Sequence, residues 1–244
     1  MFPGAGTVIN VAAIALGSLV GVLIGKKLSE KFRLLITDVL GCVTAISAAD
    51  ALSAYWDESF TNALPAGGAI IVVVFSLLIG AMIGSWLKIE ESLEVFGGKL
   101  RDKFSKKDES NFVEGFVSAS LVFAIGPLAI LGSISDGMGE GIDQLMLKST
   151  LDGFTSIAFA ASLGWGVALS SLPVGIYQMF WTGVGITLGA VLSAYQIAAM
   201  TAVGGVLLIG ISFRLLKIKE IAIANLLPAI ALAPVIAFLL SQLK

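Results

Sequence analysis

Few side chains in this sequence could do chemistry, and the most informative are carboxylates set in apolar segments. Asp38 and Asp152 are each embedded in an otherwise apolar stretch, and Lys148 precedes Asp152 by four residues. In a helix this spacing puts Lys148 and Asp152 one turn apart on the same face. A carboxylate that faces a cavity can bind Na⁺ or another hard cation through oxygen, or carry a proton. The pair therefore has two interpretations, a local salt bridge at the outer membrane edge or a switchable pair that lines a cavity.

Other polar groups could complete such a site. Asn10 and Asn225 add amide oxygens near the two ends of the chain. Pro127 removes a backbone donor and predicts a helix break that exposes carbonyl oxygens. Asp136 opens the acidic stretch 136–143, which lacks the spacing of a calcium-binding loop and is interpreted as a solvated vestibule. The predicted ion- or substrate-binding residues are Asp152, Lys148, Asp38, Asn10, Asn225, Pro127 and Asp136.

Several classes of protein are excluded by composition. The sequence contains no histidine, so it lacks the commonest general base and the commonest transition-metal ligand. Cys42 is the single cysteine, so no intramolecular disulfide can form. A net charge of −2 offers no basic stripe for nucleic acid. No Asp–Asp or Ser–Lys pair sits in a recognisable catalytic motif, and we expect neither enzymatic activity nor a cofactor.

Membrane helices must position these residues. Hydrophobic residues make up 57% of the 244 residues and charged residues only 13%, about half the charged share of a soluble domain. Charge-free runs that can cross the bilayer predict an all-α polytopic transmembrane bundle, a single membrane domain over 1–244, with about eight spans. The predicted spans are 7–25, 34–55, 66–87, 112–134, 147–170, 174–192, 198–216 and 221–240.

The distribution of basic residues predicts the orientation of these spans. Thirteen of the fifteen basic residues fall in the loops after spans one, three and seven, and the loops after spans two and four are acidic. By the positive-inside rule both termini then lie outside the cytoplasm. The segment before span one has no basic residue, so we expect no cleaved signal peptide. The polar stretch 88–111 is a cytoplasmic loop, interpreted as a solvated hairpin or short surface helix, or as a docking surface for a partner.

Small residues recur at helical spacing in three spans. Such rows allow close helix packing, either within the monomer or between copies in a homo-oligomer. The rows are Gly17, Gly21 and Gly25; Ser76, Gly80 and Gly84; and Gly185, Gly189 and Ser193.

Two spans contain helix-breaking residues, and faint internal similarity accompanies them. Pro127 interrupts span four, and Pro228 with Pro234 interrupts span eight. Paired broken spans are typical of transporter binding sites, although ordinary proline kinks have the same sequence pattern. Matching spans one to three with six to eight would make an inverted repeat, whereas matching the broken spans would make a parallel four-plus-four repeat.

Four segments carry a resemblance to a known family. They are GTVIN at 6–10, GPLAILGSISDG at 126–137, KSTLDGF at 148–154 and ANLLPA at 224–229. With them the sequence resembles, over essentially its whole length, the YqgA/YdfK-like family of uncharacterised prokaryotic multi-pass membrane proteins. The resemblance implies a protein of the prokaryotic inner membrane and supplies no substrate or functional residue.

The leading functional hypothesis is a small secondary transporter or ion-coupled permease. Its site would lie between spans four, five and eight, with Asp152 binding the cation or proton. Asn10, Asn225 and carbonyls freed near Pro127 would complete the site, and Asp38 would gate or relay on the cytoplasmic side. The partners are the lipid bilayer and a small ion or solute. Two alternatives stay open, an oligomeric channel that uses the glycine rows as its interface, and a scaffold or regulator acting through 88–111.

Overall fold

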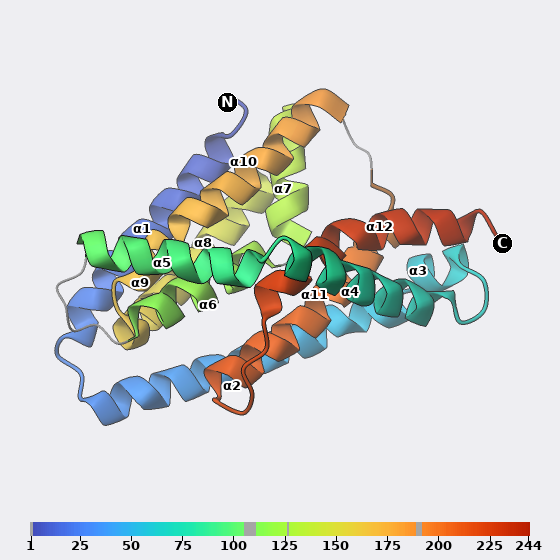
Figure 1. Ribbon diagram of the computed structural model, residues 1–244. Helices are drawn as coiled ribbons and strands as arrows, with labels where there is room; N and C mark the ends of the chain where they lie inside the picture. The colour runs from blue at the N-terminus through green and yellow to red at the C-terminus, as the bar shows by residue number, and fades with distance from the viewer. Residues whose placement is uncertain (1, 105–110, 126, 189–191) are drawn as a thin grey trace. The chain divides into compact units, whose positions relative to one another are not determined.

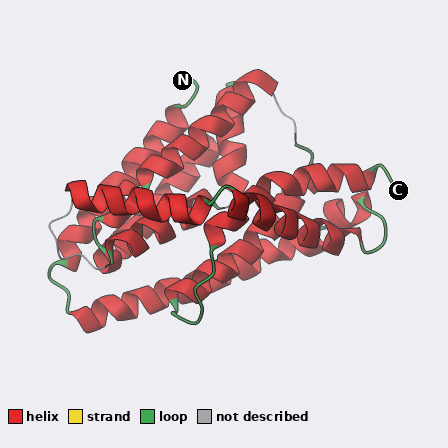
Figure 2. Ribbon diagram, viewed as in Figure 1, coloured by secondary structure: helices red, strands yellow, loops and turns green. Residues whose placement is uncertain are grey.

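The computed structural model describes residues 2–104, 111–125, 127–188 and 192–244, and every regular element in these ranges is a helix (Figures 1 and 2). The predicted all-α class is confirmed. The longer helices are α1 (Ala5–Gly25), α2 (Glu30–Ser53), α4 (Gly68–Trp86), α5 (Ile89–Phe104), α6 (Phe112–Ala124), α7 (Pro127–Met138), α8 (Asp143–Leu163), α10 (Ser171–Leu188), α11 (Ala194–Leu215) and α12 (Pro228–Ser241). Shorter elements are η1 (Ala54–Trp56), α3 (Glu58–Ala63), α9 (Gly166–Leu169) and η2 (Ile223–Leu226).

Over its described residues, each predicted span coincides with a helix or a helix pair. Within the described ranges five helical segments are long and apolar enough to cross a membrane, namely Ala5–Gly25, Glu30–Ala63, Gly68–Trp86, Ala194–Leu215 and Ile223–Ser241. The pair Phe112–Ala124 and Leu128–Met138 makes a sixth if it is counted as one span. Helices α8 and α10 fall outside this set, so the count of eight crossings stays a prediction.

Both predicted helix interruptions are present. The axes of Phe112–Ala124 and Leu128–Met138 differ by 61°, so span four is broken as the proline at 127 predicts. Gly126, the residue before Pro127, lies outside the described residues. In span eight the break is the 3₁₀ segment η2, which ends just before Pro228 opens α12. Proline is favoured at this position because its missing N–H has no helical acceptor there. Pro234 lies inside α12.

The predicted loop 88–111 begins as a helix. Helix α5 covers most of it, with acidic residues in its first turn and basic residues in its last, which suits the helix dipole. Glu90, Gly97 and Leu100 are buried, so α5 is a packed surface helix over these turns. Residues 105–110 of the same stretch lie outside the described residues.

The chain divides into two compact units, each assembled from separated segments. The first comprises residues 1–40, 93–124 and 128–190, and the second comprises 41–92, 125–127 and 191–244. Neither predicted repeat coincides with these units, because each unit mixes spans from both halves of the chain.

A backbone-to-backbone seam between α1 and α8 organises the first unit. A Cβ atom at Gly6 would collide with Leu145, and one at Gly25 would collide with the carbonyl of Ala161, so the two helices run parallel. Helix α10 packs antiparallel to α1, with Gly175 against Val11 and Met179 against Gly4. The predicted glycine row of span one lies in the seam, where Gly17, Gly21 and Gly25 meet Gly153, Ile157 and Ala161.

The second unit uses its small residues in the same way. Helix α4 packs antiparallel to α12, because Gly80 meets Ala229 and Gly84 meets the carbonyl of Asn225. The capping box of Ser193 and Gln196 starts α11 at Ala194, so this helix begins before the predicted start of span seven at residue 198. Of the third small-residue row, Gly185 packs on Ile134 in the first unit and Gly189 lies outside the described residues. Packing within the chain therefore occupies the first two rows.

Helix directions within each unit follow the parity of the spans. Spans one and five are parallel, whereas spans one and six, and spans three and eight, are antiparallel. Eight alternating crossings require these same directions, because spans of equal parity must cross in the same sense.

Candidate functional site

The first candidate site begins on α8, where Lys148 and Asp152 form a buried ion pair. Lys148 Nζ donates to Asp152 Oδ2 over 2.7 Å, and the two residues are only 6% and 7% exposed. Asp152 lies nine residues after the start of α8 at Asp143, which places it about 13 Å along the helix at 1.5 Å per residue. A buried charge pair in a helix that the sequence predicts to cross the membrane marks a candidate functional site.

Asn10 meets this pair from across the seam. Its Nδ2 donates to the same Asp152 Oδ2 over 3.0 Å, and Asn10 is fully buried. The parallel register of α1 and α8 makes the contact possible, since it brings residues 142 positions apart in sequence to one level. Asn10 Oδ1 is buried and has no hydrogen-bond partner among the described residues. Thr7 Oγ1, one turn earlier on α1, is likewise buried without a hydrogen-bond partner among the described residues.

Unpartnered buried polar atoms are rare because each costs about 1–3 kcal/mol relative to a satisfied group. Where two of them adjoin a buried ion pair, the arrangement has unused hydrogen-bonding capacity. Asp152 Oδ1 also receives no hydrogen bond from the part of the chain that the structure describes. The hydrogen-bonded group of Asn10, Lys148 and Asp152, together with Thr7 one turn earlier on α1, is called the seam cluster below; Thr7 Oγ1 and Asn10 Oδ1 are its unpartnered buried atoms.

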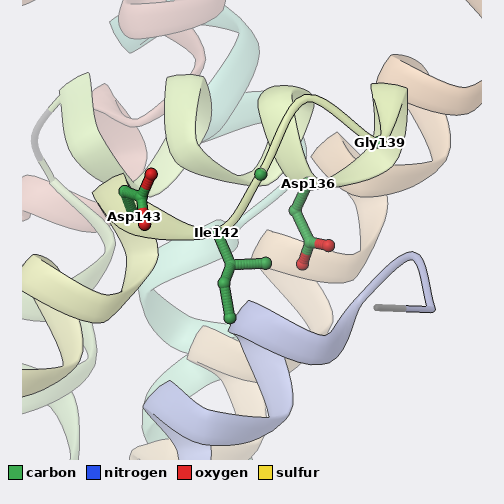
Figure 3. A pocket seen from close by; sticks show the side chains of 5 residues that line it. Asp136, Gly139, Ile142 and Asp143 are labelled. Carbon is green, nitrogen blue, oxygen red and sulfur yellow. The ribbon is translucent and has the colours of Figure 1, made fainter.

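Asp136, near the end of α7, contacts the first turn of α1 and lines a pocket. Its Oδ2 accepts from the backbone N–H of Gly6 over 2.9 Å, and Asp136 is 2% exposed. Figure 3 shows its carboxylate pointing to the first turn of α1, while that of Asp143 points elsewhere. The pocket of about 250 Å³ is lined by Asp136, Gly139, Gly141, Ile142 and Asp143. Asp136 thus anchors a helix N-terminus, where a negative charge is favoured.

A second buried cluster, in the second unit, is centred on Glu90. Its Oε1 accepts from Arg214 Nη1 over 2.5 Å and its Oε2 from the backbone N–H of Ala224 over 2.7 Å. The backbone N–H of Glu90 donates to Asn225 Oδ1 over 2.9 Å. Glu90 therefore joins the ends of α5, α11 and the broken segment η2. This group of Glu90, Arg214, Ala224 and Asn225 is called the Glu90 cluster below.

The structure brings some of the predicted site residues together and distributes the others. Asn10, Lys148 and Asp152 form one hydrogen-bonded group in the first unit. Asn225 belongs to the second unit, where its amide oxygen accepts a hydrogen bond from the backbone N–H of Glu90. Asp38 is exposed on α2, and no hydrogen bond or ion pair reaches it from the described residues. Pro127 begins α7, and its side chain lies outside the described set.

Two residues of these clusters, Glu90 and Thr7, are not among the site residues that the sequence predicts. Glu90 follows Lys88 at the start of a polar stretch, so its charge fits a solvated loop. The one available signal is its apolar neighbourhood, Trp86, Leu87 and Ile89. Thr7 lies at the first position of a predicted span, where a hydroxyl is unremarkable. Within the described ranges no three His, Cys, Asp or Glu side chains lie close enough together to hold a metal ion.

Comparison with known proteins identifies the family of the chain. The profile of the family described as "Protein of unknown function (DUF554)" matches residues 5–238. The "Uncharacterized membrane protein YdfK" of Bacillus subtilis (strain 168) is 29% identical over 235 residues, which are 96% of each chain. The "Uncharacterized protein YqgA" of Escherichia coli (strain K12) is 29% identical over 232 residues, 93% of this chain and 94% of its own. No solved structure matches the chain. The resemblance read from the four sequence segments is confirmed.

Proposed function

This chain belongs to the DUF554 family of membrane proteins of unknown function, and we propose that it is a small secondary transporter or ion-coupled permease. The observation that carries the proposal is the buried pair of Lys148 and Asp152, met by Asn10 across the α1–α8 seam. A charged pair inside apolar helices costs free energy, and in membrane proteins such pairs mark ion and substrate paths.

The proposed chemistry is an exchange of partners at Asp152. In this conformation the carboxylate is neutralised by Lys148 and oriented by Asn10. A cation or proton that reaches Asp152 displaces Lys148, which leaves an ammonium group to be stabilised by another partner. Binding at the site therefore changes the internal ion pair, and such a change is a means of coupling two bound species.

In the proposed transporter, the broken helices are the part of the protein that moves. Helix α7, which follows the 61° bend, carries Asp136 near its end, and Asp136 holds the first turn of α1. A change in this bend would act on the N-terminal turn of α1, and Asn10 lies at the start of the next turn. Asp38 is not part of the proposed site because its side chain is exposed.

The channel alternative stays a prediction that depends on the third small-residue row, since the first two rows pack within the chain. We place the transporter in the prokaryotic inner membrane with both termini outside the cytoplasm, as the distribution of basic residues favours.

The test is solute-driven current on a solid-supported membrane that carries reconstituted protein. A panel of cationic, anionic, zwitterionic and neutral solutes is applied to the wild type, to Asp152→Asn and to Asp50→Asn. Asp50 is the matched control because it is exposed on α2. We expect a current for at least one class that Asp152→Asn abolishes and Asp50→Asn keeps. An unchanged current in Asp152→Asn, or no current with any class, contradicts the proposal.

A further inference from the structure

The seam cluster has two ends of opposite chemistry, set by the register of two parallel helices. Gly6 of α1 meets Leu145 of α8, and Asn10 meets Asp152, so Lys148 lies between these levels, beside the turn that carries Thr7. One end therefore has the backbone positions of Lys148 and Thr7, each one turn before its partner in the Asn10–Asp152 contact. The other end holds Asp152 and the Asn10 amide oxygen. One helical turn, about 5 Å, separates the backbone positions of Lys148 and Asp152 along the axis, and the Lys148 side chain spans it to bring Nζ to 2.7 Å from Asp152 Oδ2.

Each end has one charged group and one unpartnered neutral group. A hydrogen-bond donor accompanies the cation, and a hydrogen-bond acceptor accompanies the anion. At the Lys148 end, the buried Thr7 hydroxyl can donate a hydrogen bond and has no partner among the described residues. At the Asp152 end, the buried Asn10 Oδ1 can accept one and is likewise unpartnered. The Lys148 end is thus complementary to a carboxylate, and the Asp152 end is complementary to an ammonium group.

We propose that the substrate of this site is a small zwitterion that carries one ammonium and one carboxylate group close together, as an α-amino acid does. The inference rests on the proposed function and adds its substrate class. The ammonium group takes the place of Lys148 at Asp152 and donates a further hydrogen bond to Asn10 Oδ1. The carboxylate accepts from Lys148 and from the Thr7 hydroxyl.

Charge balance favours this class over simple ions. Lys148 and Asp152 together are neutral, and both are nearly excluded from solvent. A net cation at Asp152 would leave Lys148 without a counter-charge, and a net anion at Lys148 would do the same to Asp152. A buried charge that loses its partner is strongly destabilising. A zwitterion replaces one ion pair by two and leaves no charge uncompensated.

The seam limits the size of the substrate. Next to Asp152, the backbone of Gly153 packs against Gly17 so closely that a Cβ at Gly17 would collide with its carbonyl oxygen. On the other side, a Cβ at Gly6 would lie 2.6 Å from the Leu145 side chain. The helices cannot separate locally by much without breaking these contacts, so side chains no larger than those of glycine, alanine or serine are expected.

The experiment measures binding to the purified full chain in detergent by isothermal titration calorimetry. The probes are glycine and L-alanine, with glycine methyl ester as the cationic match and N-acetylglycine as the anionic match. We expect binding of the two zwitterions and at least tenfold weaker binding of the two charged analogues. Binding of either charged analogue as tight as that of glycine overturns the proposal, and so does absence of binding by both zwitterions.

Two variants locate the binding at the seam cluster without removing a buried charge. Thr7→Val keeps the shape of the side chain and removes the hydroxyl, and we expect glycine affinity to fall about tenfold, the effect of one lost hydrogen bond to a charged group. Thr150→Val is the matched control, because Thr150 is exposed on α8 and bonds its own helix at Met146. Equal affinities of Thr7→Val and the wild type overturn the assignment.

The outcomes separate this inference from the proposed function. Zwitterion binding without current in any class contradicts transport and keeps the binding site. Asp152-dependent current driven only by a charged or neutral solute keeps transport and overturns the zwitterion.

Discussion

Arg214 Nη1 and Glu90 Oε1 lie 2.5 Å apart, and both side chains are largely withdrawn from solvent, at 14% and 9% exposure. The same carboxylate caps η2 through Ala224. One residue therefore neutralises a cation and satisfies a backbone donor at a helix break.

We expect Glu90→Gln to lower the free energy of unfolding by about 3 kcal/mol, because it leaves the Arg214 charge uncompensated and weakens the Ala224 bond. Thermal unfolding in detergent measures the effect. Glu91→Gln is the control, since the Glu91 side chain is 68% exposed. Similar unfolding temperatures for the two variants would show that the Glu90 cluster adds no stability.

The Lys148–Asp152 pair should show strong non-additivity. Lys148→Met and Asp152→Asn each leave one buried group without its partner, so each should cost several kcal/mol, about 3–5 for a fully buried pair. The double variant removes both charges and should be more stable than either single variant. A double-mutant cycle on thermal stability checks this. Additive losses would mean that the pair does not interact in the folded protein.

Substitution of Gly21 by alanine should destabilise the chain strongly, because the new methyl group would collide with the carbonyl of Ile157. Gly183→Ala is the matched control on α10, where nothing lies within 4 Å of the new methyl group. There alanine should be neutral or stabilising by up to about 1 kcal/mol through helix propensity. Yield of monodisperse protein and its unfolding temperature measure both. Equal tolerance of the two substitutions contradicts the seam.

Removing the carboxylate of Asp136 should loosen the beginning of α1. Asp136→Ala deprives the Gly6 N–H of its acceptor, at a cost of about 1 kcal/mol for a lost N-terminal cap. Hydrogen exchange at residues 5–10 should then accelerate several-fold. Asp143→Ala lines the same pocket and makes no bond to α1, so it should leave this exchange unchanged. Acceleration by both variants alike would assign the effect to the pocket rather than to the cap.

The predicted orientation can be tested with introduced cysteines, because Cys42 is the single native one. In a Cys42→Ser background, Ser59→Cys should react with a membrane-impermeant maleimide in intact cells. Lys103→Cys should react only after permeabilisation. Both positions are exposed. The reverse pattern, or both sites on one side, would show that the termini do not both lie outside.

Local sequence properties predicted the helices well and their partners poorly. Hydropathy and proline placed α1 and the break before Pro228, since both depend on neighbouring residues. The pairing of Asn10 with Asp152 depends on the register of α1 against α8, which no local pattern encodes. For the same reason Glu90 was assigned to a loop. Its burial results from Arg214 and Ala224, which approach from more than 120 positions away.

The α1–α8 seam also has a consequence for synthesis. The hydrogen bond from Asn10 to Asp152 cannot form until Asp152 has been synthesised, 142 residues later. At ordinary translation speeds this takes about 7–28 s. Throughout that interval α1 resides in the bilayer with an amide and a glycine surface facing lipid or an insertion factor. Nascent α1 therefore depends on assistance during membrane insertion, and release of the chain before residue 152 leaves it without its native partner.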